Sequence, residues 1–300
     1  MVNADYRNIT RWLLEQIRAG QSAHALLQSM TERGWRRDIA MGLIARAMGE
    51  RSGEPGVSPA ATQVSAQPAA QPGVPDGSAP RVPMMPQPAL DGAPMSLDVG
   101  DRRTSVLVTL PEPKIVLFGD FLSKNECERL VEVARPRMQR SLTTDLKTGD
   151  NKLDVVRTSR GMFFNRSESP LIAAIETRIA RLLAWPVEKG EHLQVLHYRP
   201  GDRYEPHYDY FDPAGDAAPT LLARGGQRVA TLLIYLREPE SGGETVFPDL
   251  GLRFAPKRGC ALFFSYDRPH PSTKTLHGGA PVIAGEKWVA TKWLREGVFE

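Results

Sequence analysis

The C-terminal third of the chain predicts many short strands, and this pattern leaves few folds open. β-Branched and aromatic runs alternate there with turns that contain Gly and Pro. Short strands broken in this way pair as antiparallel sheets in a sandwich or a barrel. The predicted strands are Gln194–Tyr198, Tyr204–Tyr210, Arg228–Leu236, Cys260–Ser265 and Lys287–Leu294.

Two helices and two further strands are predicted ahead of this region. Ser123 and Glu126 have the spacing of a capping box, which predicts a helix through Ala134. Residues 170–184 carry apolar side chains at helical spacing, and the apolar runs 114–118 and 157–164 predict strands. Helices followed by strands favour a mainly β fold with flanking helices (α+β), in which a jelly roll is supported by helices on one side.

Composition divides the chain into three parts. Residues 1–50 predict a small all-α module of three short helices, because apolar residues recur there at helical spacing. Residues 51–95 contain no aromatic side chain and are rich in Pro, Ala, Gln, Gly and Ser, so we expect a disordered linker. Residues 96–300 are left for one large domain.

Charge, cysteine content and hydropathy argue against several classes of protein. Lys and Arg outnumber Asp and Glu by 38 to 35, and this balance does not favour a nucleic-acid partner. The two cysteines stand in apolar surroundings and suggest neither a disulfide framework nor a zinc site. No apolar run predicts a membrane span or the core of a signal peptide, so we expect a cytoplasmic protein without a membrane partner.

His207 and Asp209 are two residues apart in a predicted strand. Their side chains therefore point to the same face. An imidazole and a carboxylate on one face supply two of the three ligands of a facial triad for non-haem iron. A histidine further along the chain would complete the triad, and His277 is our candidate. The alternative is a half-buried histidine beside a surface aspartate.

Lys287 is predicted to lie on the inner face of the last strand. Alternation places Val289, Thr291 and Trp293 on the same face and Lys292 on the other. A buried ammonium needs an anion, which is either an internal Asp or Glu or the carboxylate of a ligand. Two hydroxyl side chains in nearby predicted strands, Tyr198 and Thr231, would complete an anion pocket beside a metal.

Several motifs occur together and in a fixed order. They are Phe121-Leu122-Ser123 leading into Glu126-Cys127, Arg157-Thr158-Ser159, Glu191-x-Leu193-Gln194-Val195-Leu196-x-Tyr198-x-Pro200-Gly201, Tyr204-x-x-His207-x-Asp209, Gly242-Gly243-Glu244-Thr245-Val246-Phe247-Pro248 and His277-Gly278-Gly279-x-Pro281-Val282-x-x-Gly285-x-Lys287-Trp288. On these motifs, residues 114–296 resemble the prolyl 4-hydroxylase branch of the iron(II)/2-oxoglutarate dioxygenases. The N-terminal 95 residues lie outside the resemblance. The absence of an endoplasmic-reticulum signal and of a thioredoxin-like domain makes the short bacterial type the nearer likeness.

The resemblance implies a double-stranded β-helix that binds Fe(II), 2-oxoglutarate and O2, with L-ascorbate as reductant. It implies iron held by His207, Asp209 and His277, and the remote carboxylate of 2-oxoglutarate held by Lys287 with Tyr198 and Thr231. Residues implied on the peptide side are Arg157, Glu191, Tyr204 and Trp293.

The implied reaction hydroxylates an unactivated C–H bond, with succinate and CO2 as coproducts. A prolyl residue in a peptide or protein is the leading substrate. Two alternatives stay open: the same chemistry on a free amino acid or another small molecule, or a non-catalytic, cupin-like module that binds 2-oxoglutarate. For residues 1–50, the sequence allows either binding of a protein partner or docking on the catalytic domain.

Overall fold

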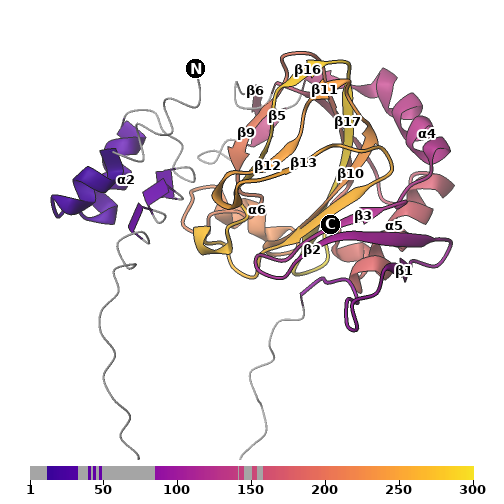
Figure 1. The fold of residues 1–300 in the computed structure, drawn as a ribbon, viewed down its shortest axis with the longest axis horizontal. Helices are drawn as coiled ribbons and strands as arrows, with labels where there is room; N and C mark the ends of the chain where they lie inside the picture. The colour runs from indigo at the N-terminus through magenta and orange to yellow at the C-terminus, as the bar shows by residue number, and fades with distance from the viewer. Residues whose placement is uncertain are drawn as a thin grey trace, which may run out of the picture. The chain divides into compact units, whose positions relative to one another are not determined.

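The structure is a computed structural model that describes residues 12–32, 40–41, 43–44, 47–48, 85–140, 142–144, 151–153 and 158–300. The chain divides into two compact units, Met1–Trp35 with Leu43–Met84, and Arg36–Gly42 with Met85–Glu300 (Figure 1). No helix in the described ranges has the length and apolar character needed to cross a bilayer.

The first unit is helical where it is described. Residues 12–18 form a helix, and a second helix, α2, spans Ala23–Glu32. Leu13, Ile17, Leu26 and Met30 are buried, so these two helices share an apolar interior. Residues 43–44 and 47–48 are also helical, as the sequence predicts for this part of the chain.

The second unit contains a nine-stranded antiparallel sheet. Its strands follow the order β1-β2-β3-β14-β10-β17-β8-β7-β4. Their bounds are β1 Ser96–Asp98, β2 Arg103–Leu110, β3 Ile115–Gly119, β14 Ala261–Ser265, β10 Arg228–Arg237, β17 Lys287–Arg295, β8 Leu193–Tyr198, β7 Arg160–Phe164 and β4 Gln139–Arg140. All five strands predicted in the C-terminal third are present; four of them contribute to this sheet.

A four-stranded sheet of order β13-β12-β15-β9 carries the fifth predicted strand, and two strand pairs complete the unit. The bounds are β13 Leu252–Phe254, β12 Thr245–Phe247, β15 His277–Gly279 and β9 Tyr204–His207, with the pairs β11 Ser241–Gly242 and β16 Val282–Ala284, and β5 Leu142–Thr144 and β6 Asn151–Leu153. A cavity is lined by residues of both large sheets, including Leu233 of β10 and Thr245 of β12. The two sheets thus form the predicted double-stranded β-helix.

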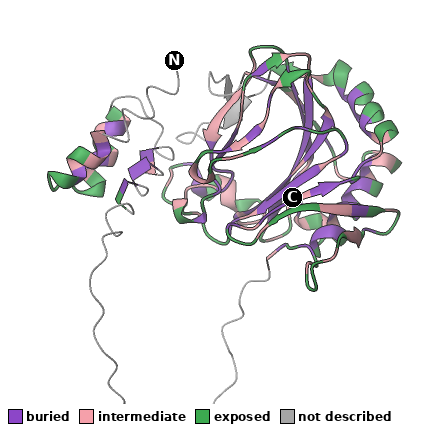
Figure 2. Cartoon of the chain, in the orientation of Figure 1, coloured by how far each residue is buried: buried purple, intermediate pink, exposed green. Residues whose placement is uncertain are grey.

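Helices cover the other face of the nine-stranded sheet (Figure 1). Helix α4 spans Lys124–Ala134 and begins with the predicted capping box of Ser123 and Glu126, and helix α5 spans Pro170–Leu183. Shorter helical segments are α6 Ala218–Ala223 and the 3-10 turns η2 Arg135–Arg137, η3 Val187–Lys189, η4 Pro248–Leu250 and η5 Pro271–Thr273. Apolar residues of α4, α5 and the sheet form the main core, and the strands beneath the helices are buried along most of their length (Figure 2).

Ordered packing of the second unit begins earlier than residue 96, where the sequence places the end of the linker. Met85 and Leu90 pack against the main core. The backbone of Gln87 donates to the carbonyl of Leu183 at the end of α5 (2.9 Å). These contacts bury apolar surface that the Pro-rich composition conceals, and they correct the boundary to Met85.

Candidate active site

His207, Asp209 and His277 line the cavity and converge on a common point. His207 ends β9, His277 begins β15, and the two residues are direct partners in the antiparallel register. The sequence predicts a strand through Tyr210, but β9 ends at His207, and Asp209 stands two residues beyond that end. Its Oδ1 and Oδ2 lie 3.5 Å from His207 Nε2 and 3.4 Å from His277 Nε2. All three side chains are buried, and one donor atom from each lies within 4.8 Å of the others.

Backbone carbonyls orient both imidazoles. His207 Nδ1 lies 2.9 Å from the carbonyl of Glu205, and His277 Nδ1 lies 3.0 Å from that of Thr275. A carbonyl only accepts, so each Nδ1 carries a proton, and each ring turns its Nε2 toward Asp209. Burial lowers the pKa of His277 to about 4, despite the nearby Asp209 carboxylate, so this imidazole is neutral at neutral pH.

The Asp209 carboxylate is ionised. Burial acts to raise its pKa, but His277, His207 and Arg228 hold the pKa well below its usual range. Two imidazoles and one carboxylate on a single face are the donor set of a facial iron(II) site with open positions. The residues present therefore fit a non-haem iron ion.

Lys287 begins β17 and lines the same cavity. It is only 4% exposed, and no ion pair to it is found in the described ranges. Its Nζ lies above the rings of Tyr198 (5.4 Å to the centroid) and Tyr235 (5.9 Å). Of the two sources of an anion that the sequence leaves open, the described residues supply no carboxylate in an ion pair with Lys287; Glu244 acts on its charge only from a longer distance.

Alternation along β17 is as predicted. Val289, Thr291 and Trp293 line the cavity with Lys287. Lys292 points away and forms a buried ion pair with Glu176 of α5 (2.7 Å between Nζ and Oε1). The two lysines of this strand therefore have different environments: one is paired in the helical layer, and the other faces a cavity that can admit an anion.

Tyr198, Tyr204 and Trp293 line the cavity as well. Tyr198 is the register partner of Lys287, and the Tyr204 ring stacks on His207 with 3.7 Å between centroids. Arg157, which the sequence places on the peptide side, lies outside the described residues.

Thr231 does not lie beside Lys287, and this corrects its predicted place in the anion pocket. Its Oγ1 donates to Asp209 Oδ2 (2.6 Å) and lies 2.9 Å from the hydroxyl of Tyr266. Its register partner on β17 is Trp293, at the opposite end of the strand from Lys287.

Thr245 is the threonine that lines the cavity near Lys287. It pairs with Gly279, where an added Cβ would lie 3.9 Å from Lys287 Nζ. Thr245 also accepts a hydrogen bond from the buried Tyr235 hydroxyl (2.8 Å). Sequence reasoning did not single out Thr245, although it stands in the quoted motif of residues 242–248.

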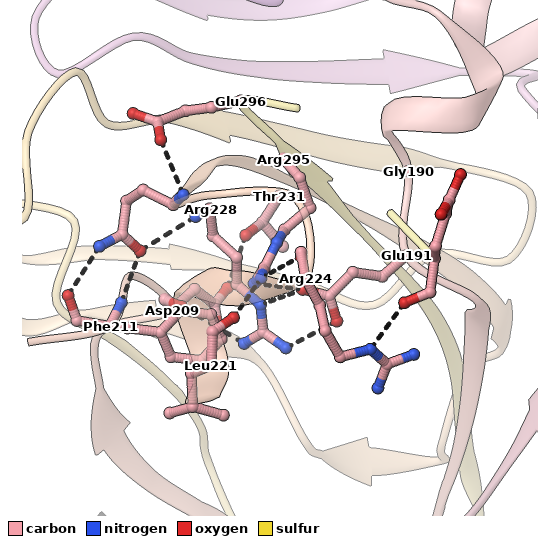
Figure 3. Close-up of polar contacts among 12 residues, drawn as sticks. Gly190, Glu191, Asp209, Phe211, Leu221, Arg224, Arg228, Thr231, Arg295 and Glu296 are labelled. Carbon is pink, nitrogen blue, oxygen red and sulfur yellow. Dashed lines mark hydrogen bonds and ion pairs between the residues drawn. The ribbon is translucent and has the colours of Figure 1, made fainter. Parts of the chain in front are cut away.

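Glu191, which the sequence places on the peptide side, is held by two arginines and is not part of the cavity lining. Its carboxylate accepts from Arg228 Nε and NH2 (2.6 and 2.9 Å) and from Arg295 NH1 (3.1 Å), as Figure 3 shows. Arg228 also donates to the backbone carbonyl of Asp209 (3.3 Å), and its guanidinium lies 3.9 Å from the centroid of the Trp293 ring. Glu191 therefore fixes the Arg228 guanidinium, which in turn contacts Asp209 and Trp293 of the site.

Replacing Glu191 with alanine is expected to lower the free energy of unfolding by about 3–5 kcal/mol, because it leaves the buried guanidinium of Arg295 and the half-buried one of Arg228 without their carboxylate. Urea denaturation of the variant measures the loss. Glu238→Ala, which removes an exposed partner of Lys257, serves as the control and should cost less than about 1 kcal/mol. If Glu191→Ala instead keeps the wild-type stability and binds peptide more weakly, Glu191 contacts the peptide substrate.

Comparisons with known proteins agree with this geometry. Residues 193–295 match the family described as the 2OG-Fe(II) oxygenase superfamily. Probable prolyl 4-hydroxylase 3 of Arabidopsis thaliana is 42% identical over 222 residues, which cover 67% of this chain and 75% of the relative. Prolyl 4-hydroxylase 1 of the same plant is 45% identical over 201 residues, covering 61% and 69%.

A solved structure, the viral collagen prolyl hydroxylase of Paramecium Bursaria Chlorella virus-1, is 32% identical with a TM-score of 0.48, covering 60% of this chain and 95% of the other. With a curated relative 42% identical over three quarters of its length, the chain belongs to the prolyl 4-hydroxylase family of iron(II)- and 2-oxoglutarate-dependent oxygenases.

Proposed function

We propose that this enzyme hydroxylates prolyl residues in a peptide or protein, and that Lys287 captures the remote carboxylate of 2-oxoglutarate. The observation that carries the proposal is the buried Lys287 ammonium, which has no ion pair in the described ranges and faces the cavity that holds His207, Asp209 and His277. A buried cation of this kind is stable only with an anion beside it, and a dicarboxylate cosubstrate supplies one.

Each part of the cavity then has a task. His207, Asp209 and His277 hold Fe(II), which together with 2-oxoglutarate and O2 supplies the oxidation that places a hydroxyl on a C–H bond and releases succinate and CO2. Lys287 fixes the far carboxylate, with the Thr245 and Tyr235 hydroxyls at the same end. The apolar lining of Leu196, Leu233 and Val289 excludes bulk water.

Tyr204 and Trp293 are the proposed walls on the substrate side, with Arg157 as a further contact. Both aromatic side chains line the cavity, Tyr204 on the small sheet and Trp293 on the large one. Flat rings on two sides suit a pyrrolidine ring, which is apolar on both faces. The names of the Arabidopsis relatives, prolyl 4-hydroxylases, support the same substrate class.

Mass spectrometry tests the substrate. Proline-containing peptides and cell proteins are incubated with enzyme, Fe(II), 2-oxoglutarate and ascorbate, the reductant we propose, and proline is expected to gain one oxygen atom. The His207→Ala variant, which lacks one of the three proposed iron ligands, serves as the negative control. Incorporation of oxygen into another residue type, or into a free amino acid only, would refute the prolyl assignment and leave the oxygenase chemistry intact.

The apparent KM for 2-oxoglutarate is expected to rise about tenfold per pH unit above pH 8. Burial lowers the pKa of Lys287 to about 8, although Glu244 acts in the opposite direction. The ammonium that attracts the carboxylate is therefore present below pH 8 and lost above it. Initial rates at saturating iron from pH 7 to pH 10 measure the effect.

Lys287→Arg is the control for this pH profile, since a guanidinium stays charged over the whole range. Its KM for 2-oxoglutarate should not depend on pH between 7 and 10. An equal rise in the variant would assign the titration to another group.

We also propose that residues 1–50 bind a protein partner, with docking on the catalytic domain as the alternative outcome. Support comes from the buried Leu13, Ile17, Leu26 and Met30, which give the helices of residues 12–32 an apolar interior of their own. Residues 85–300 and the full chain are compared on a short peptide and on a whole protein substrate. A loss confined to the protein substrate supports the proposal, and equal rates on both contradict it. The cytoplasmic location stays a prediction.

A further inference from the structure

A chain of two hydroxyl groups ends on the Asp209 carboxylate. Thr231 Oγ1 lies 2.6 Å from Asp209 Oδ2 and 2.9 Å from the hydroxyl of Tyr266. An ionised carboxylate only accepts, so the single hydroxyl proton of Thr231 is directed to Asp209. Thr231 must then accept from Tyr266, and the direction of both hydrogen bonds is fixed.

The fold holds both hydroxyls rigidly. Thr231 of β10 is the register partner of Phe264 of β14, and Tyr266 stands two residues further on, on the same face of the sheet. The backbone N–H of Tyr266 donates to the carbonyl of Val229 (3.0 Å), which continues the ladder beyond the end of β14. Thr231 is fully buried and Tyr266 is 2% exposed, so water does not compete for these bonds.

The phenol stays protonated. Burial and the Asp209 carboxylate raise the pKa of Tyr266 well above its ordinary value. Its ring also packs edge-on against Tyr210, with 5.9 Å between centroids. Tyr266 is therefore a fixed donor aimed at Thr231.

We propose that Thr231 and Tyr266 are positioning residues that occupy Asp209 Oδ2, so that the carboxylate serves iron as a one-oxygen ligand through Oδ1. A carboxylate that takes two positions on the metal leaves fewer for cosubstrate and O2, whereas a facial triad needs three open positions. A hydrogen bond on Oδ2 also fixes the rotation of the carboxylate and thereby pre-organises the site. The inference rests on the proposed function, because it assumes that these three residues hold iron.

The test is the metal affinity of the full chain in the absence of 2-oxoglutarate and peptide. Thr231→Val keeps the shape of the side chain and removes the hydroxyl; it is expected to weaken Fe(II) binding about 10–100-fold in anaerobic titrations. Tyr266→Phe removes the outer hydroxyl and should weaken binding less, by a few-fold. The visible spectrum of bound Co(II) should change in Thr231→Val, because the coordination of Asp209 changes.

A double variant distinguishes two linked hydrogen bonds, in which Tyr266 acts through Thr231, from two independent effects on Fe(II) affinity. Once Thr231 has lost its hydroxyl, Tyr266 no longer reaches Asp209, so Thr231→Val/Tyr266→Phe should bind Fe(II) as Thr231→Val does. Thr104→Val is the matched control, since it also removes a buried hydroxyl, which donates to the carbonyl of Gly119 (2.7 Å), but outside the site. Its affinity for Fe(II) should equal that of the wild type.

Three results would overturn the proposal: wild-type affinity in Thr231→Val, additive losses in the double variant, or an equal loss in Thr104→Val. Thr231→Ser keeps the hydroxyl and should retain affinity. If Thr231→Val does not fold, the Fe(II) affinity of Tyr266→Phe is the deciding measurement. An unchanged affinity in Tyr266→Phe would then refute the proposed role of the two hydroxyls. Because no substrate is present, failure to hydroxylate proline would not affect this measurement.

Discussion

Replacing His207 with alanine is expected to reduce iron-dependent turnover of 2-oxoglutarate by more than about 100-fold, because loss of a ligand should exceed the 10–100-fold typical of groups behind the ligands. His207 presents Nε2 to the common point with its Nδ1 fixed by the carbonyl of Glu205. Two remaining ligands leave the iron weakly held. Anaerobic Fe(II) titration and release of succinate measure affinity and turnover separately.

His270→Ala is the matched control for this experiment. His270 is exposed in the segment that precedes β15 and does not line the cavity. The control variant should bind Fe(II) and turn over 2-oxoglutarate as the wild type does. Unchanged turnover in His207→Ala would show that the metal lies elsewhere.

Replacing Lys287 with alanine is expected to raise the KM for 2-oxoglutarate by roughly 100-fold or more, since losing one member of a buried charge pair costs about 3–5 kcal/mol. Iron binding should persist, because Lys287 is not one of the three converging donors. Steady-state kinetics over a wide range of 2-oxoglutarate, with Fe(II) titration alongside, measure both quantities.

Lys292→Ala separates the loss of an anion site from the loss of any buried lysine on β17. Lys292 is also buried, but it pairs with Glu176 on the helical side of the sheet. This control should lower the free energy of unfolding and leave the KM for 2-oxoglutarate unchanged. If Lys287→Ala and Lys292→Ala change the KM equally, the effect comes from destabilised packing.

Local periodicity was sufficient for much of the fold and for the main features of the site. Side chains alternate across a strand whatever its neighbours are, so the sequence correctly divided β17 into a cavity face with Lys287 and a helical face with Lys292. The capping box of α4 is equally local, because both of its partners lie within one turn. His207 and Asp209 converge as predicted, but β9 ends at His207, so alternation along a strand does not by itself account for the position of Asp209.

Distances between strands could not be predicted in this way. Thr231 shares its face of β10 with the cavity-lining Leu233, but its position along the cavity depends on the register with β17, where it pairs with Trp293. Trp293 is six residues from Lys287, which is roughly 20 Å along a strand at about 3.3 Å per residue. Thr231 therefore serves Asp209, and Thr245 lies near the lysine instead.

By itself, then, the sequence determined seven of the strands, the capped helix and the candidate ligands His207 and Asp209, because these follow from patterns among near neighbours in the chain. Only the tertiary structure decided which groups meet. Glu191 finds its partners 37 and 104 residues away, in Arg228 and Arg295. Lys287, in contrast, is left facing a cavity with no carboxylate paired to it in the described ranges. Such pairings depend on strand register and on burial, and these are fixed only when the whole core packs.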